Sequence, residues 1–257
     1  MLRAVIWDVD GTIAETERDG HRVAFNRAFI ELGLPWTWDV QTYGRLLGVA
    51  GGRERLLSWM EVAPAAPPGL AARERLAEDL HLRKGRHYRS LVEQGAIEAR
   101  PGVVALVEQI AASGTALAVA STTGRGNVNA LFPRLFGAHW RDRFTVVVCA
   151  EDAPNKKPDP QAYQQALERL NVAAEDALAI EDSPAGLHAA RAAGVGCLIT
   201  RGSYFEHANF AGAVHVCADL DEPYAAGGVQ APLDLPMLQH IHCAGKNLLV
   251  DEDGPLR

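Results

Sequence analysis

The stretch AVIWDVDGT at residues 4–12 is the most informative in the sequence: four apolar residues are followed by two aspartates that flank Val9, then a glycine and a threonine. A short, continuous apolar run predicts a strand that is buried on both faces, as in a parallel sheet. Asp8 and Asp10 then stand at the carboxyl end of this strand, where ligands bind in open α/β sheets. Because alternate strand residues point to the same side, both carboxylates are expected to face one ligand, and Gly11 permits a sharp turn.

The same strand pattern recurs later in the chain. Similar apolar runs occupy residues 117–119, 146–148, 178–180 and 197–200. Between them, apolar residues recur at helical spacing, as in residues 103–110, which Pro101 precedes and Gly114 follows. This alternation predicts an α/β fold with a Rossmann-like parallel sheet that helices cover on both faces.

Residues 16–100 break the alternation. They have helical periodicity and no convincing strand, which predicts a helical cap domain inserted into the α/β core. The core domain is then expected to comprise residues 1–15 and 101–220. Residues 221–257 have weak periodicity and are expected to form an irregular C-terminal extension, and the Pro- and Ala-rich residues 64–69 are expected to form a loop.

Composition excludes several classes of function. The 25 lysines and arginines against 32 aspartates and glutamates give a net charge of −7, the opposite of the basic footprint of a nucleic-acid-binding domain. No apolar run approaches the roughly 18 residues that indicate a membrane span, and the residues before the first strand do not have the apolar segment and cleavage site expected of a signal peptide. Four scattered cysteines without a C-x-x-C pair indicate reduced thiols. We therefore expect a cytoplasmic protein that has no nucleic acid or membrane as partner.

The acidic residues at two strand ends suit phosphoryl transfer. One carboxylate can attack phosphorus to form an aspartyl-phosphate, and a second can protonate the leaving oxygen and later activate water. Glu181 and Asp182 end a later strand, and Asp8, Asp182 and the backbone carbonyl of Asp10 form the all-oxygen set that Mg²⁺ prefers. The alternative is that these aspartates cap the turn and the helix that follow their strands.

Two other strand ends carry groups that suit a phosphate. Ser121, Thr122 and Thr123 offer hydroxyl and backbone N–H groups to phosphate oxygens. Lys156-Lys157-Pro158 follows the next strand, and Lys157 is expected to offset the charge of the carboxylates and the phosphoryl group. The alternatives are ordinary turn residues and a solvated lysine loop.

The four sets follow one another in the order DxDGT, Ser/Thr, Lys and Glu-Asp, and in this the sequence resembles the haloacid dehalogenase superfamily of phosphohydrolases and mutases. The resemblance implies that Asp8 is the nucleophile, Asp10 the general acid and base, Ser121 a phosphate binder, Lys157 the charge stabiliser, and Glu181 and Asp182 the acids of the Mg²⁺ site. The dehalogenases of this superfamily lack the second aspartate, so the presence of Asp10 argues against dehalogenation.

Parts of the cap resemble the CbbY family more closely. They are AETE at 14–17, HR at 21–22, AFN at 24–26, GLPWTWD at 33–39 and GGRER at 51–55. That family is associated with xylulose-1,5-bisphosphate phosphatase, which removes an inhibitor of the carbon-fixing enzyme of the Calvin cycle. The resemblance implies that Glu17 and His21 contact the sugar, and that the distal phosphate is bound by Gly51, Gly52, Arg53, Arg55 and Lys84.

The chemistry of these cap residues agrees with that assignment, because glycines allow close backbone approach and guanidinium groups bind phosphate bidentately. The alternative is that the cap arginines and Lys84 are solvated helix residues and that His21 lies on the surface. Trp36 and Trp38 are expected to pack in the core of the cap rather than stack on a sugar.

We therefore expect a Mg²⁺-dependent phosphatase that acts as a monomer on a sugar phosphate or bisphosphate, with xylulose 1,5-bisphosphate as the first choice. Closure of the cap expels water, and a bisphosphate bridges both domains. The alternatives are a sugar phosphomutase of the β-phosphoglucomutase type, a phosphoglycolate phosphatase, and a catalytically silent metabolite-binding module on the same fold.

Overall fold

The computed structural model, which describes residues 1–226 and 229–251, is built around a six-stranded sheet. The strands are β1 (Ala4–Trp7), β2 (Ala116–Ala120), β3 (Phe144–Val148), β4 (Ala177–Glu181), β5 (Gly196–Thr200) and β6 (His215–Cys217). All pairs are parallel, in the order β3-β2-β1-β4-β5-β6. Strand β1 thus lies between β2 and β4, which brings the carboxyl ends of the three strands together.

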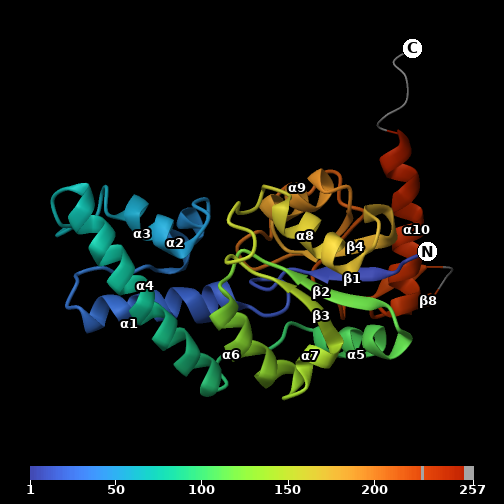
Figure 1. The fold of residues 1–257 in the computed structure, drawn as a ribbon, viewed down its shortest axis with the longest axis horizontal. Coiled ribbons are helices and arrows are strands. Elements are labelled where there is room, and N and C mark those ends of the chain that lie inside the picture. The colour runs from blue at the N-terminus through green and yellow to red at the C-terminus, as the bar shows by residue number, and fades with distance from the viewer. Residues whose placement is uncertain (227–228, 252–257) are drawn as a thin grey trace, which may run out of the picture.

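Helices cover both faces of this sheet (Figure 1). One face carries α5 (Val103–Ser113), α6 (Arg125–Phe136), α7 (Trp140–Arg143) and α10 (Leu235–Asp251), and the other carries α8 (Gln161–Leu170) and α9 (Pro184–Ala192). In β1, Val5 and Trp7 are buried toward the first set, while Ala4 and Ile6 are buried toward the second. The predicted α/β fold, with strands that are apolar on both faces, is confirmed.

Residues 17–93 fold into a second group of helices beside the sheet, with an aromatic core of their own (Figure 1). They are the π-helical turn η1 (Glu17–His21), α1 (Arg22–Glu31), α2 (Val40–Leu46), α3 (Gly52–Trp59) and α4 (Leu70–Glu93). Trp38 is fully buried, its ring centroid 4.8 Å from that of Phe25 and 4.9 Å from that of Phe29. Trp36 packs in the same cluster, as predicted, and residues 64–69 form the expected loop between α3 and α4.

The two chain crossovers between the sheet and this helical group lie side by side. Ala14 on the first crossover pairs with Ala99 on the second, and the amide of Arg100 donates to the carbonyl of Ile13 at 2.9 Å. The separate aromatic core agrees with a cap of residues 16–100 inserted into a core of residues 1–15 and 101–220. These boundaries stay a prediction.

The C-terminal extension, predicted to be irregular, instead contains regular structure. Strands β7 (Tyr224–Ala226) and β8 (Val229–Ala231) form an antiparallel hairpin, and α10 packs against the sheet. Leu235, Leu238 and Ile241 recur every three residues and are buried in the main apolar cluster. This spacing gives the helix one apolar side, which is sufficient to stabilise it once it packs against the apolar face of the sheet. The prediction of an irregular tail was therefore wrong. Residues 227–228 and 252–257 of the predicted extension lie outside the described residues.

One 3₁₀ turn, η2 (Ala174–Asp176), precedes β4. Across the described part of the chain, no helix combines the length and apolar character that a bilayer span requires.

Candidate active site

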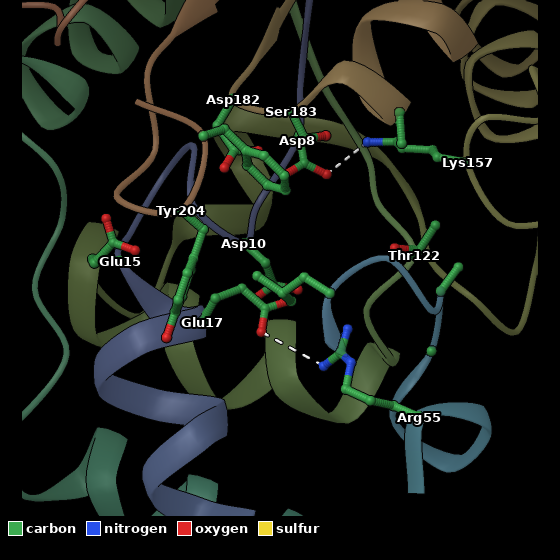
Figure 2. Close-up of a pocket in the computed structure, with 15 residues that line it drawn as sticks. Asp8, Asp10, Glu15, Glu17, Arg55, Thr122, Lys157, Asp182, Ser183 and Tyr204 are labelled. Atoms are coloured by element: carbon green, nitrogen blue, oxygen red, sulfur yellow. Dashed lines mark hydrogen bonds and ion pairs between the residues drawn. The ribbon is translucent and has the colours of Figure 1, made fainter. Parts of the chain in front are cut away.

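The carboxyl ends of β1 and β4 bring three aspartates to one pocket. The amide of Asp8 donates to the carbonyl of Ile180 at 3.0 Å, which fixes the end of β1 beside β4. Gly11 has a φ of +89°, and a Cβ at this position would overlap the Asp182 carboxylate. Only glycine therefore allows the turn to approach Asp182 this closely. Asp8, Asp10 and Asp182 all line the pocket, as predicted from their places at strand ends (Figure 2).

Lys157 is buried between two of the acids. Its Nζ donates to Asp8 Oδ1 at 2.6 Å and to Glu181 Oε1 at 2.5 Å, and it lies 5.1 Å from the centre of the Tyr163 ring. Burial alone lowers the pKa of this lysine, but the charges of Asp8 and Glu181 outweigh it and raise the pKa above the ordinary value. Lys157 therefore stays charged, and the alternative of a solvated lysine does not hold for this residue.

The acids Asp8, Glu181 and Asp182 form a buried cluster whose oxygens lie within 4.8 Å of one another. Burial raises the pKa of Asp8 to about 8 against the opposing charge of Lys157, and burial together with the charge of Asp8 raises the pKa of Asp182 well above its usual range. Ionising all three acids would leave more negative charge than Lys157 neutralises, which is why these pKa values are raised, and a hard divalent cation with oxygen ligands would offset that charge. The donor set fits Mg²⁺.

Within that cluster, Glu181 differs from the two aspartates because its oxygens are already engaged. Oε1 accepts hydrogen bonds from Lys157 and, at 2.7 Å, from the Tyr163 hydroxyl, and Oε2 accepts from the Asp182 amide at 3.3 Å. Glu181 is 1% exposed and is absent from the pocket lining. It lies behind Lys157 and holds that lysine in place.

Asp10 turns away from Lys157, toward the cap. Its Oδ1 accepts a hydrogen bond from the Thr16 hydroxyl at 2.5 Å and lies 3.2 Å from His21 Nε2. Burial raises the pKa of Asp10, but the interactions with His21 and Thr16 outweigh it and hold the pKa well below its usual range. His21 is buried and tilted against the Tyr88 ring, 4.4 Å between centroids, so it is not a surface histidine.

The pocket around Asp8, Asp10 and Asp182 is the first of two adjoining chambers. The second chamber shares five residues with it: Asp10, Glu17, Gly51, Arg55 and Thr122. It is also lined by His21, Phe25, Tyr43, Gly52, His81, Lys84, Thr123, Gly124 and Asn127. Lys157 lines only the first chamber and Lys84 only the second, while Asp10 and Arg55 line both.

The cations of the second chamber are buried. Lys84 is 5% exposed, and its Nζ lies 5.3 Å and 5.4 Å from the centres of the Phe25 and Tyr88 rings. Burial lowers the pKa of Lys84 to about 8, although the charges of Glu17 and Asp10 oppose this. Arg55 Nη1 donates to the Tyr43 hydroxyl at 2.8 Å and lies 3.9 Å from Glu17 Oε2. Neither cation is a solvated helix residue.

Two predicted phosphate binders do not reach either chamber. Arg53 is 40% exposed and points toward Glu74 and Glu78 of α4, because positions 53 and 55 of a helix lie about 200° apart. Ser121 is buried, and its Oγ accepts a hydrogen bond from the Thr123 amide at 3.2 Å. Thr122, its neighbour, lines both chambers instead.

Comparison with known proteins assigns the family. The model of haloacid dehalogenase-like hydrolases matches residues 2–194. The chain belongs to the haloacid dehalogenase-like hydrolases. It is 42% identical over 241 residues to the plasmid-encoded protein CbbY of Cupriavidus necator, covering 93% of this chain and 90% of the relative. It is 40% identical over 235 residues to CbbY of Cereibacter sphaeroides, covering 91% and 98%.

A solved structure agrees with these relatives. A mutant of CbbY from Rhodobacter sphaeroides, crystallised in complex with xylulose 1,5-bisphosphate, matches this hydrolase with a TM-score of 0.80 at 38% identity, over 91% of this chain and 100% of that one. The predicted membership of the CbbY family is confirmed, and this haloacid dehalogenase-like hydrolase is a phosphatase.

Sequence reasoning missed several pocket residues of this hydrolase. Tyr43 donates its hydroxyl to Glu17 Oε2 at 2.5 Å, and Tyr204 lines the first chamber from the loop after β5. The signal for Tyr204 was its place just past the carboxyl end of β5, where no charged motif draws attention. Lys156 of the predicted lysine turn forms an ion pair of 2.7 Å with Glu54 of α3, across the cleft.

Proposed function

We propose that this phosphatase is a Mg²⁺-dependent sugar bisphosphatase whose substrate is xylulose 1,5-bisphosphate and whose products are xylulose 5-phosphate and inorganic phosphate. One observation carries the proposal: the acidic chamber at Asp8 adjoins a second chamber lined by the buried Lys84, and the buried Arg55 lines both. A molecule with a phosphate at each end suits such a pair of chambers. The xylulose 1,5-bisphosphate in the related CbbY structure supports this choice.

In the proposed reaction, an oxygen of Asp8 attacks the phosphorus of the first phosphate, and the bond to the sugar oxygen breaks. Asp10, whose carboxyl group is oriented by the Thr16 hydroxyl and by His21 Nε2 at 3.2 Å, passes a proton to the departing sugar oxygen. Asp10 then takes a proton from water, which attacks the aspartyl-phosphate and releases phosphate. Lys157 orients Asp8 through its 2.6 Å hydrogen bond and offsets the charge that develops beside it.

The carboxylates of Asp8 and Asp182 and the backbone carbonyl of Asp10 are the groups that would hold Mg²⁺, and Glu181 supports the site through Lys157. When bound, the ion neutralises these carboxylates and the phosphate, so that an anionic nucleophile can approach an anionic substrate. Thr122, which lines the chamber opposite these acids, is proposed to donate to the phosphate oxygens, and Ser121 shapes that loop.

The second chamber is proposed to bind the distal phosphate. Lys84 and Arg55 supply the charge, and Gly51 and Gly52 let the backbone at the start of α3 come close. Glu17 lies between the chambers, where it can accept hydrogen bonds from sugar hydroxyls. We further propose that the enzyme works as a cytoplasmic monomer on this small molecule.

The test is phosphate release from xylulose 1,5-bisphosphate, ribulose 1,5-bisphosphate, glucose phosphates and phosphoglycolate, with Mg²⁺ and with EDTA. The Asp8→Asn variant serves as the blank. The proposal predicts Mg²⁺-dependent release with a strong preference for the xylulose compound. Preference for another ester would overturn the substrate, and an isomerised sugar phosphate without free phosphate would show a mutase.

A further inference from the structure

Tyr204 belongs to the sheet domain by its place after β5, yet its ring packs in the aromatic cluster of the cap. The ring centroids of Tyr204 and Tyr43 lie 5.8 Å apart at an interplanar angle of 54°. Gly44 of α2 makes room for this contact, because a Cβ at Gly44 would lie 3.0 Å from the Tyr204 ring. Tyr204 is thus a point where the sheet domain reaches into the cap.

The loop that carries Tyr204 is held firmly on the sheet side. Arg100 donates to the carbonyl oxygens of Thr200 at 3.1 Å and Arg201 at 2.7 Å, and the same guanidinium donates to the carbonyl of Gly11 at 2.5 Å. The hydroxyl of Ser203 donates to Glu15 Oε1 at 2.8 Å. The loop is therefore fixed to both crossovers and to the turn that carries the catalytic aspartates.

On the cap side, Tyr204 contacts the residue that orders the second chamber. The Tyr43 hydroxyl donates to Glu17 Oε2 at 2.5 Å and accepts from Arg55 Nη1 at 2.8 Å. Glu17 and Arg55 line both chambers, and Figure 2 shows Tyr204 beside Glu17 at the edge of the pocket. A contact that fixes the Tyr43 ring also fixes these two side chains.

We propose that Tyr204 is a positioning residue for the bisphosphate reaction: its ring holds Tyr43, and through it Glu17 and Arg55, in their binding arrangement when the cap meets the sheet domain. The inference deepens the proposed function and rests on it. Closure of the cap then brings Glu17 and Arg55 into their binding arrangement in the same step. The preference for a bisphosphate over a monophosphate therefore depends on Tyr204, a residue outside the cap.

The test compares Tyr204→Ala and Tyr204→Phe with the wild type on xylulose 1,5-bisphosphate and on p-nitrophenyl phosphate, which has no distal phosphate. Tyr204→Ala is expected to lower kcat/KM for the bisphosphate by about ten- to hundredfold, the scale of misplaced binding groups. Its activity on p-nitrophenyl phosphate is expected to fall by a clearly smaller factor, because this substrate has no distal phosphate to misplace. Tyr204→Phe keeps the ring and is expected to retain wild-type rates on both substrates.

A matched control removes an aromatic ring outside both chambers: Tyr224→Ala, on β7 of the C-terminal extension, is expected to leave both activities intact. A double-mutant cycle with Arg55→Ala gives a readout that a purely structural role would not move, because the loss from Tyr204→Ala should shrink when Arg55 is already absent. Equal losses on both substrates, or full additivity in the cycle, would overturn the inference. A wild type that does not hydrolyse the bisphosphate would instead refute the proposed function.

Discussion

Replacing Lys84 with methionine should make the enzyme more stable and less active. The pKa of Lys84 falls from 10.5 to about 8 because the ammonium group is buried, so the charged form costs about 3 kcal/mol in the folded state. Below pH 8, Lys84 is charged in the folded and the unfolded chain, and this cost is present in full. It disappears as the pH rises from 8 to 10.5, since the unfolded state then binds more protons than the folded state.

Methionine keeps most of the volume of the lysine stem and removes the charge. At pH 7 the free energy of unfolding of Lys84→Met is therefore expected to rise by up to about 3 kcal/mol, measured by urea unfolding. If Lys84 binds the distal phosphate, loss of a charge-assisted hydrogen bond of about 1.5–3 kcal/mol lowers kcat/KM for the bisphosphate by roughly 10- to 150-fold.

The pH dependence supplies an independent check on the same residue. In the wild type, kcat/KM for the bisphosphate should fall above pH 8 as Lys84 of the free enzyme loses its proton, and Lys84→Met should lack this fall. A variant that is no more stable than the wild type and hydrolyses the bisphosphate at the same rate would contradict both expectations, because the buried charge would then neither destabilise the fold nor bind the substrate.

Three further predictions concern the metal, the cap arginines and Lys157. Because the pKa of Asp8 is about 8 without metal, the protein takes up a proton on folding, and the stability of the metal-free protein declines as the pH rises from 4 to 8. The rise in Tm on adding Mg²⁺ should therefore be larger at pH 8 than at pH 6. Equal rises would contradict the proposed site. Arg55→Ala should raise KM for the bisphosphate about tenfold or more and Arg53→Ala by less, since only Arg55 lines the chambers; steady-state kinetics showing the reverse order would contradict this. Lys157→Met should abolish turnover and cost about 3–5 kcal/mol in urea unfolding, because it leaves Asp8 and Glu181 buried without a cation; a stable, active variant would contradict this role.

The α/β core and the acidic chamber could be predicted from local sequence patterns. Apolar runs with aspartates at their ends specify parallel strands, and parallel strands gather their carboxyl ends at one edge. Asp8, Asp10, Lys157 and Asp182 therefore meet for a reason that is visible in the sequence. The helical cap could also be predicted, because residues 16–100 have helical periodicity and contain no apolar run that resembles a strand.

The cap side of the cleft was less predictable, because it depends on which face of a helix meets the sheet domain. Spacing alone does not tell whether Arg53 or Arg55 points inward, and the contact between Tyr204 and Tyr43 joins residues 161 positions apart. The C-terminal helix was missed since its apolar residues match only half of a helical pattern, and the sheet surface that they cover is a tertiary feature.

Binding of one substrate through both of its phosphates is tested by the stoichiometry of phosphate release. With xylulose 1,5-bisphosphate in Mg²⁺, the enzyme should release one phosphate per substrate and stop at the monophosphate. A monophosphate lacks the contact between the distal phosphate and the second chamber, so its kcat/KM should be lower by a factor of about a hundred or more. Release of two phosphates per substrate, or equal rates on the bisphosphate and the monophosphate, would contradict the two-chamber account.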